Sequence, residues 1–260
     1  MNIDMDKIVS IAEDAGKAIL EVYNRDFDIQ EKDDKSPLTE ADLAAHQLIV
    51  AALEQLEPKL PVLSEESAKI SYEERSRWLR YWLVDPLDGT KEFIKRNGEF
   101  TVNIALIESG RPTCGVVHMP VGNVTYFGCI GEGAKKRTEE GTVDIAVDQQ
   151  RQHPTRIVGS RSHAGDSLQR FLDRVGPHEM ISMGSSLKLC LVAEGRADIY
   201  PRLGPTSEWD TGAAQAVVEA AGGVVTDLEM KPLRYNTKDS LLNPHFLVFG
   251  DQREDWSQYL

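Results

Sequence analysis

Apolar residues recur at helical spacing in two segments near the start of the chain. One face of a predicted amphipathic helix carries Met5, Ile8, Ala12, Ala15, Ile19 and Val22. A second helix is predicted from Thr39 to about Leu56, and its apolar face includes Leu43, Val50 and Leu53. The polar segment 26–37 between the two helices indicates a hairpin or a mobile loop.

The middle of the chain alternates short β-type runs with turn signals. Residues 61–63 and 81–84 predict two short strands, and each ends at acidic residues. Three further strands are predicted at 101–107, 113–119 and 124–129, and they are separated by hairpin signals that contain Gly, Pro and Asn. We therefore expect an antiparallel meander in this region.

After about residue 150, helices and strands alternate. The strands are predicted at 156–159, 197–200, 224–225 and 246–249, and the helices at 164–175, 185–194 and 209–221. Gly222-Gly223 follows the last helix and is a glycine stop signal. This alternation is typical of α/β layers, so we expect an N-terminal α+β half at 1–150 and a C-terminal α/β half at 151–260.

The composition indicates an acidic globular protein. The chain has 260 residues, of which 41% are hydrophobic and 27% charged, and its net charge is −13. A general nucleic-acid binder needs a basic footprint, so the charge excludes that class. The sequence begins without a basic and apolar leader, and it has no apolar run long enough for a transmembrane segment.

The cysteines carry little signal. Cys114, Cys129 and Cys190 are widely spaced and form no CxxC or Cys/His cluster. This spacing supports neither a disulfide framework nor a zinc site. We expect all three cysteines to be reduced core residues of a cytoplasmic protein.

The segment Asp85-Pro86-Leu87-Asp88-Gly89-Thr90 carries the strongest functional signal. It follows the apolar run 81–84, so a buried strand delivers two carboxylates into a tight turn. Carboxylates this close repel each other and lose hydration, and a hard divalent cation such as Mg²⁺ relieves both costs because it prefers oxygen ligands. Gly89 permits a positive φ, and Thr90 adds a hydroxyl. An acidic surface turn is the alternative interpretation of this segment alone.

Three further acids lie at the ends of predicted elements. Glu65 follows the strand at 61–63, Asp210 stands at the start of a helix, and Asp42 comes three residues after Thr39. Taken singly, a solvated loop explains Glu65, and helix capping explains Asp42 and Asp210. A helix start also suits a phosphate, because its free N–H groups point outward. The case for a common site therefore depends on the whole set.

The set resembles a known family. Glu65, the segment Asp85 to Thr90, Trp209-Asp210 and Gly222-Gly223 occur in this order along nearly the whole chain. The order resembles the pattern of the inositol monophosphatase superfamily of Mg²⁺-dependent, Li⁺-sensitive phosphatases. The resemblance implies a layered α/β fold, an α-β-α-β-α sandwich with its active site between two halves. Most metal ligands would lie in the half at 1–150, and Asp210 and the substrate-binding residues in the half at 151–260.

Two stretches narrow the resemblance. Lys32 to Asp42 and Asp88 to Ile94 are similar to the bacterial 3′(2′),5′-bisphosphate nucleotidases of sulfate assimilation. Inositol monophosphatases usually have Thr-Asn-Phe where this chain has Lys91-Glu92-Phe93. The resemblance implies Mg²⁺-dependent hydrolysis of the 3′-phosphate of adenosine 3′,5′-bisphosphate (PAP) to AMP, with the phosphosulfate donor PAPS as a second substrate. It implies a cytoplasmic location. Some relatives associate peripherally with the inner membrane, and no sequence feature of this chain indicates whether it does so. The oligomeric state also stays open.

The resemblance also assigns metal ligands. It gives Glu65, Asp85 and the Leu87 carbonyl to a first Mg²⁺, and Asp85, Asp88 and Asp210 to a second. Asp85 would bridge the two ions. A third, looser ion near Glu65 and Asp42 is left open.

The catalytic residues implied in this way are Asp42, Thr90 and Glu65. Thr90, hydrogen-bonded to Asp42, would orient and help deprotonate a metal-activated water for in-line displacement, and Glu65 would assist. The leaving oxygen would receive its proton from a water beside Asp210. No covalent phosphoenzyme is needed.

The substrate contacts are the least determined part. The residues implied are Glu65, Leu87, Asp88, Gly89, Thr90, His163, Ser185, Lys188, Arg202 and Asp210. Ser185 would cap a helix and, with Lys188, meet the 5′-phosphate or ribose, while Arg202 would meet the 5′-phosphate. His163 would contact the adenine or a phosphate. Solvated charges explain Lys188 and Arg202 equally well, and a surface histidine explains His163.

Three other functions are weighed against this one. An inositol or sugar monophosphatase of the same superfamily is disfavoured by the segment 33–42 and by Lys91-Glu92. A non-catalytic phosphate-binding protein is disfavoured because all the acids and Thr90 are present. A serine hydrolase based on Ser185-x-x-Lys188 would need Ser-Asp-Asn and Lys-Thr-Gly partner motifs, which do not occur.

Overall fold

A seven-stranded sheet forms the first half of the fold. The computed structural model describes residues 3–31, 37–67, 69–159 and 166–260. In sheet order the strands are β3 (Val62–Ser64), β4 (Arg80–Asp88), β5 (Thr101–Glu108), β6 (Arg111–Met119), β7 (Val124–Cys129), β8 (Gly133–Thr138) and β9 (Gly141–Ile145). β3 is parallel to β4, and the other neighbours are antiparallel. The predicted meander is confirmed, and β8 and β9 extend it.

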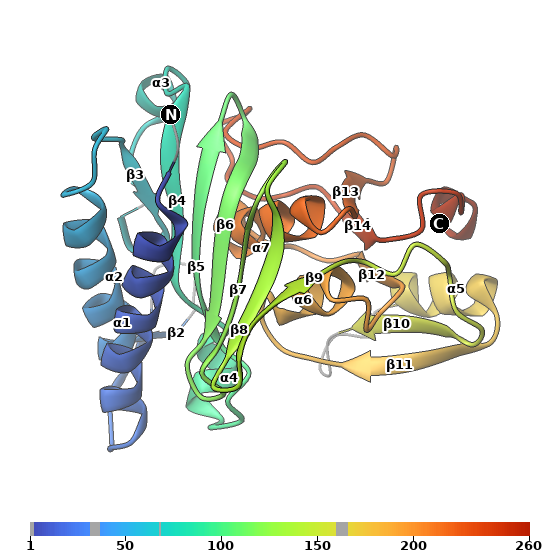
Figure 1. Cartoon of the computed structure of the whole chain (residues 1–260), viewed down its shortest axis with the longest axis horizontal. Helices are drawn as coiled ribbons and strands as arrows, with labels where there is room; N and C mark the ends of the chain where they lie inside the picture. Colours follow the sequence, from blue (N-terminus) through green and yellow to red (C-terminus); the bar gives the residue numbers. More distant parts are fainter. Residues whose placement is uncertain (1–2, 32–36, 68, 160–165) are drawn as a thin grey trace.

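Two antiparallel helices cover one face of this sheet (Figure 1). They are α1 (Met5–Tyr23) and α2 (Glu40–Leu53), and they share a core with the sheet residues Trp82, Val84 and Ile104. The face predicted for α2 is partly wrong, because Leu43 is exposed. The buried face of α2 instead carries Ala41, Asp42, Ala45, Ile49 and Leu53. The carboxylate of Asp42 interrupts the apolar pattern on this buried face, and for this reason the pattern predicted a different face.

The second sheet has five strands. Its order is β11 (His178–Ser182), β10 (Thr155–Gly159), β12 (Ile199–Arg202), β14 (Phe246–Phe249) and β13 (Val224–Asp227). β10 is parallel to β11 and β12, whereas β14 is antiparallel to β12 and β13. The strand β11 was not predicted, since its side chains are largely exposed and it lacks an apolar run.

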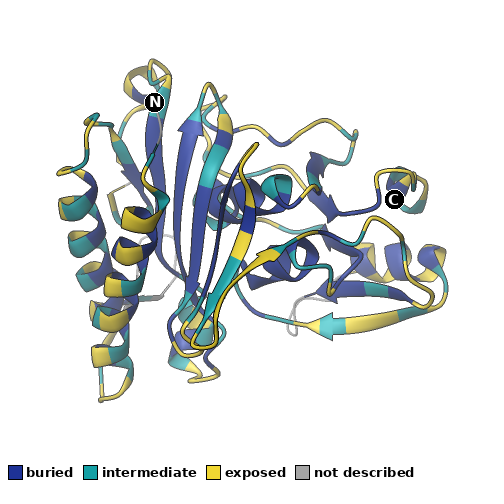
Figure 2. Ribbon diagram, in the orientation of Figure 1, coloured by how far each residue is buried: buried dark blue, intermediate teal, exposed yellow. Residues whose placement is uncertain are grey.

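Helices lie between the two sheets and outside the second one (Figure 1). The central helices are α6 (Leu187–Ala193) and α7 (Glu208–Ala220), whose core includes Leu83, Ala105 and Val248 from the two sheets. The outer layer is α5 (Asp166–Val175) with the 3₁₀ helix η2 (Trp256–Tyr259). Figure 2 shows the central layers as mostly buried and the outer faces of α1 and α2 as exposed. The predicted α-β-α-β-α sandwich is confirmed.

The remaining elements are short. β1 (Ile29–Glu31) and β2 (Pro37–Thr39) form an antiparallel pair, so the predicted hairpin is confirmed. The 3₁₀ helix η1 (Glu65–Ser67) and the helices α3 (Tyr72–Arg75) and α4 (Thr90–Ile94) were not predicted. They are too short for an apolar period to be visible.

The predicted end of α7 is confirmed. Gly222 adopts φ 91°, and its N–H donates to Glu219 O while the N–H of Gly223 donates to Val218 O. These two bonds close the helix, and the left-handed φ between them favours glycine. The division of the chain at about residue 150 stays a prediction.

The expectation for two of the cysteines is wrong. Cys114 and Cys129 form a disulfide, because they stand opposite each other on β6 and β7 with their Cα atoms 4.1 Å apart. This pairing depends on the register of the hairpin, so the spacing of the cysteines along the chain could not predict it. Cys190 is buried and unbridged, as expected. Within the described ranges, no helix has the length and apolar character needed to span a bilayer.

Candidate metal and substrate site

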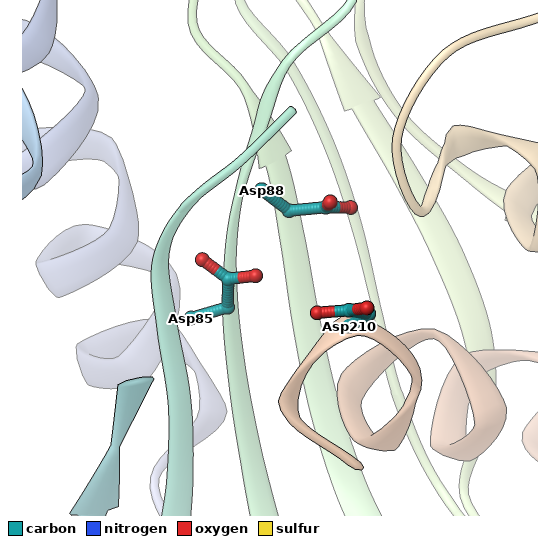
Figure 3. A group of neighbouring side chains, drawn as sticks. All are labelled: Asp85, Asp88 and Asp210. Carbon is teal, nitrogen blue, oxygen red and sulfur yellow. The ribbon is translucent and has the colours of Figure 1, made fainter. Parts of the chain in front are cut away.

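Three aspartates from two elements converge between the sheets (Figure 3). Asp85 and Asp88 lie near the end of β4, and Asp210 lies in the first turn of α7. One carboxylate oxygen of each lies within 4.8 Å of the other two. Asp85 is 1% exposed. Asp85 and Asp88 of the first half of the chain and Asp210 of the second half, all predicted from the sequence, therefore lie together.

Strand alternation aims Asp85 at this position. Tyr81 and Leu83 contribute to the core that contains α7, whereas Trp82 and Val84 contribute to the core under α1 and α2. Side chains two residues apart share a face, so Asp85 points toward α7. The register of β4 against β5 shifts between Asp85 and Asp88, which ends the regular pairing.

The turn after β4 places the next polar groups. Asp85 Oδ1 accepts a hydrogen bond from the N–H of Leu87 at 3.0 Å. Gly89 has φ 92°, which a side chain disfavours, and it starts α4 with Thr90 as the first helical residue. The Thr90 hydroxyl lies 3.4 Å from both Leu87 O and Asp42 Oδ1.

Asp42 is held by the cap of its own helix. Its Oδ2 accepts from the N–H of Thr39 at 2.8 Å and from the Thr39 hydroxyl at 2.7 Å. The predicted capping box is confirmed. The capping bonds use Oδ2, so Oδ1 remains directed at Thr90. Asp42 can therefore cap its helix with one carboxylate oxygen and face Thr90 with the other.

Asp210 also combines two roles. The helix begins one residue earlier than predicted, at Glu208, and Asp210 Oδ2 accepts from the N–H of Ser207 at 2.9 Å. The cap orients the carboxylate, and its oxygen still joins the cluster with Asp85 and Asp88.

The cluster is electrostatically costly without a cation. Burial, followed by the charges of Glu65, Asp88 and Asp210, raises the pKa of Asp85 well above its ordinary value. Burial and the charge of Asp88 also raise the pKa of Asp210. Buried like charges favour protonation unless a cation compensates them. Three convergent carboxylate oxygens are the donor set that Mg²⁺ prefers, so the residues fit such an ion.

Glu65 stands beside this cluster at the end of β3, as predicted. It is the first residue of η1 and is partly exposed. Its charge and a hydrogen bond with Asp85 both act on the pKa of Asp85. Glu65 is therefore placed to share a cation with Asp85.

A cleft extends from the acids toward a pair of basic residues. Its lining includes the acidic residues Asp88 and Asp210 with Gly89, which we call the acidic end, and the basic residues Lys188 and Arg202, which we call the basic end. Lys188 is 8% exposed, and burial, with a smaller effect of Arg202, lowers its pKa to about 8. Its Nζ donates to Ser185 O at 2.6 Å. Lys91 and Glu92 also line this cleft.

The role predicted for Ser185 as a helix cap is wrong. The N-cap of α6 is Ser186, and Ser185 has φ 54°. The Ser185 hydroxyl donates to Asp88 Oδ2 at 2.6 Å instead. A carboxylate across the cleft attracts this hydroxyl more strongly than a helix end does, and sequence spacing cannot show that. His163 lies outside the described residues.

Sequence reasoning missed several polar groups at this junction. Thr101 and Asn103 on β5 and the Ser186 side chain are buried and hydrogen-bonded to one another. The only available signal was the presence of polar residues inside the apolar run 101–107, at alternate positions that share a face.

The chain is similar to known proteins over nearly its whole length. The model of the Inositol monophosphatase family matches residues 4–254. The chain is 51% identical over 246 residues to 3′(2′),5′-bisphosphate nucleotidase CysQ of Escherichia coli K12, covering 94% of this chain and 98% of that protein. It is 38% identical over 254 residues to the CysQ nucleotidase of Haemophilus influenzae, covering 97% and 94%.

A solved structure is similar over the same length. The crystal structure of CysQ from Bacteroides thetaiotaomicron, described as a bacterial member of the inositol monophosphatase family, aligns with a TM-score of 0.84 and 42% identity. The alignment covers 95% of this chain and 96% of that one. From the acidic cluster, the five-layer fold and these full-length similarities, we conclude that the chain belongs to the inositol monophosphatase family.

Proposed function

We propose that this protein is a Mg²⁺-dependent 3′(2′),5′-bisphosphate nucleotidase that removes the 3′-phosphate of PAP and yields AMP and phosphate. The observation that carries the substrate class is a single cleft lined by both carboxylates and basic side chains. One end suits a phosphate ester held at cations, and the other suits a second phosphate. The identity with CysQ nucleotidases over nearly the full length supports the nucleotide. PAPS, which carries a related 5′ group, is the second substrate we propose.

Asp85, Asp88, Asp210, Glu65 and the Leu87 carbonyl are the residues we assign to the metal. Two Mg²⁺ ions, with a third left open, would supply the positive charge that stabilises the attacking and leaving oxygens of an in-line displacement. The chain itself holds the acids in place through the Leu87 N–H, the Ser207 N–H and the Ser185 hydroxyl.

Thr90 and Asp42 are placed to take a proton from the attacking water. The Thr90 hydroxyl reaches Asp42 Oδ1 at 3.4 Å, a long hydrogen bond that substrate binding would tighten. When Thr90 donates to Asp42, its lone pairs can accept from water. The Thr39 bonds fix Asp42 in the orientation that this relay needs. Glu65 assists on the same side, and a water held by Asp210 returns the proton to the leaving 3′-oxygen.

Lys188, Arg202 and Ser185 bind the rest of the nucleotide. We assign the 5′-phosphate to Lys188 and Arg202, which with Lys91 are the cationic residues that line the cleft in the described part of the chain. Burial lowers the pKa of Lys188 although Asp88 raises it, and a bound phosphate would further stabilise the charged form of Lys188. Gly89 and Thr90 approach the scissile phosphate. His163 stays a prediction for the adenine or a phosphate.

Comparison of PAP with 3′-AMP tests this assignment, because 3′-AMP lacks only the 5′-phosphate. The Lys188→Met variant should lower kcat/KM for PAP by roughly 10–100-fold, as expected for a lost charged hydrogen bond, and leave kcat/KM for 3′-AMP nearly unchanged. Lys95→Met, a change of the same kind in an exposed residue, serves as the control. An equal loss with both substrates would remove Lys188 from the 5′-phosphate site.

Two further properties follow from the family membership and stay proposals. Li⁺ at millimolar-order concentration should inhibit turnover in the presence of Mg²⁺. The protein acts in the cytoplasm, where its nucleotide substrates are formed. An inositol or sugar monophosphatase remains the second candidate, favoured by the same acidic cluster but not by the basic end of the cleft.

A further inference from the structure

We propose that Thr101 and Asn103 of β5, together with Ser186, are positioning residues that hold the Asp88 carboxylate for cation binding. The inference rests on the proposed function, since it takes Asp88 as a metal ligand. It concerns a chain of hydrogen bonds that joins the seven-stranded sheet to the loop before α6.

Asp88 is held by one of its two oxygens. Asp88 Oδ2 accepts from the Ser185 hydroxyl at 2.6 Å and from the Ser186 N–H at 2.6 Å. Short bonds of this kind to a carboxylate are charge-assisted and strong. Both fall on the same oxygen, so the carboxylate plane is fixed while Oδ1 keeps its lone pairs for a cation.

The direction of the next bond follows from proton counting. Thr101 Oγ1 lies 2.5 Å from Ser185 Oγ. Ser185 has a single hydroxyl proton, and it is used on Asp88. Thr101 must therefore donate to Ser185, which gives a one-way chain from Thr101 through Ser185 to Asp88. Such a chain strengthens the terminal bond, because a hydroxyl that accepts becomes a better donor.

Ser186 and Asn103 close the network on its second side. Ser186 donates its single proton to Asn103 Oδ1 at 2.8 Å, and its Oγ lies 2.9 Å from Thr101 Oγ1, so Ser186 flanks the chain from Thr101 to Asp88 without adding a proton to it. Thr101 and Asn103 occur on β5 at alternate positions, on the face that carries Ala105 and Ile107 toward α7. All three polar residues are at most 2% exposed. Asn103 Nδ2 has no hydrogen-bond partner among the described residues, so the paired hydroxyls, and not this amide N–H, specify the arrangement of the loop.

The loop itself is held in an unfavourable conformation. Ser185 has φ 54°, in the left-handed region that a serine seldom adopts. The preceding N–H, that of Gly184, donates to Glu99 Oε2 at 2.8 Å. These contacts keep Ser185 where its hydroxyl reaches Asp88 and its carbonyl accepts from Lys188 at 2.6 Å. The same residue thus links the acidic end of the cleft to its basic end.

The test is Mg²⁺ binding by calorimetry to the Thr101→Val variant, which removes the hydroxyl and keeps the shape. We expect Mg²⁺ affinity to fall roughly tenfold, the usual effect of losing a group that orients a metal ligand. Thr101→Ser keeps the hydroxyl and should bind Mg²⁺ as the wild type does.

Thr125→Val is the matched control. Thr125 is 1% exposed on β7, and its hydroxyl is 2.9 Å from His118 Nδ1, away from the cluster. It should lower the thermal stability without changing Mg²⁺ affinity. If Thr101→Val does not fold, the Ser186→Ala variant replaces it in the test. This variant removes one hydroxyl of the network and keeps the N–H that donates to Asp88. We expect its Mg²⁺ affinity to fall two- to threefold.

The failures can be told apart. Unchanged Mg²⁺ affinity in both Thr101→Val and Ser186→Ala, beside a wild type that binds Mg²⁺, would overturn the positioning role alone. A wild type that binds no Mg²⁺ would overturn the metal assignment of the proposed function. A loss in Thr101→Val that Thr101→Ser shares would also contradict the inference, because the hydroxyl would then not be its cause.

Discussion

The two ends of the cleft are built in different ways. At the acidic end, Asp85 and Asp88 come from the last residues of β4, and the carboxylates are oriented by neighbouring N–H groups and hydroxyls. At the basic end, Lys188 and Arg202 come from α6 and β12, and each donates to a backbone carbonyl, of Ser185 and Pro205. The acidic end is arranged in advance for cations. The charged groups of the basic end donate to neutral carbonyls, and a phosphate can replace these carbonyls as the acceptor.

Like charges repel one another within each end, and this repulsion contributes to the shifted pKa values. Burial and then neighbouring acids raise the pKa of Asp85, whereas burial and then Arg202 lower the pKa of Lys188, against an opposing effect of Asp88. Each end therefore binds the opposite charge more tightly than isolated residues would. A substrate with one phosphate at each end satisfies both.

Removal of the acid shared by both proposed metal positions should have the largest effect. Asp85→Asn keeps the shape but removes the charge, and kcat should fall on the order of a thousandfold or more, comparable to the loss of a major electrostatic contact. Far-UV circular dichroism should show an intact fold. Asp144→Asn, a change in an exposed residue of β9, is the control and should leave kcat unchanged. An active Asp85→Asn enzyme would break the assignment of the acidic end.

Loss of the Thr90 hydroxyl should have a smaller effect. Thr90→Val should lower kcat roughly a hundredfold, the usual contribution of proton transfer, with little change in KM. Thr90→Ser should recover most of the activity because it keeps the hydroxyl near Asp42. If Thr90→Ser is as slow as Thr90→Val, the methyl group rather than the hydroxyl is important.

A change at the basic end should mainly weaken substrate binding. Arg202→Gln should raise KM for PAP roughly tenfold, because it removes one charged partner of the 5′-phosphate and leaves Lys188 in place. Steady-state kinetics with PAP and 3′-AMP measure this. A fall in kcat at unchanged KM would contradict the division of labour between the two ends.

The smallest expected effect is on stability and depends on pH. The folded-state pKa values of Asp85 and Asp210 are raised, so the metal-free fold binds more protons than the unfolded chain above the ordinary carboxyl range near pH 4. Its free energy of unfolding should therefore fall as the pH rises from about 4 toward neutrality. Thermal melts in a chelator should show this slope, and Mg²⁺ should weaken it. If the Asp85→Asn variant showed the same dependence of stability on pH, the acidic cluster would not be the origin of this dependence.

The acidic end was largely predictable from the sequence. Asp85 to Thr90 form one short motif on an apolar strand, and Asp42 and Asp210 occupy helix starts that capping rules locate. Local chemistry fixes such positions before the chain folds. The five-layer architecture was predicted only through the family resemblance.

The contacts that depend on register or on packing between sheets were not predictable. The Cys114–Cys129 bond needs the β6–β7 register, and the Thr101 network needs the loop before α6 to lie against β5. Ser185 was assigned to a helix cap, because spacing alone cannot show that its hydroxyl reaches Asp88 across the cleft. Two strands, β8 and β9, were missed because their side chains are mostly exposed and polar.

The central claim is that this cleft selects a nucleotide with two phosphates. Its most direct test is phosphate release with Mg²⁺ from PAP, inositol 1-phosphate and fructose 1,6-bisphosphate, compared by kcat/KM. We predict that PAP is preferred over inositol 1-phosphate by roughly a hundredfold or more, since the basic end adds charged hydrogen bonds to the 5′-phosphate. A preference for inositol 1-phosphate, or no phosphate release from any of the three, would contradict the account.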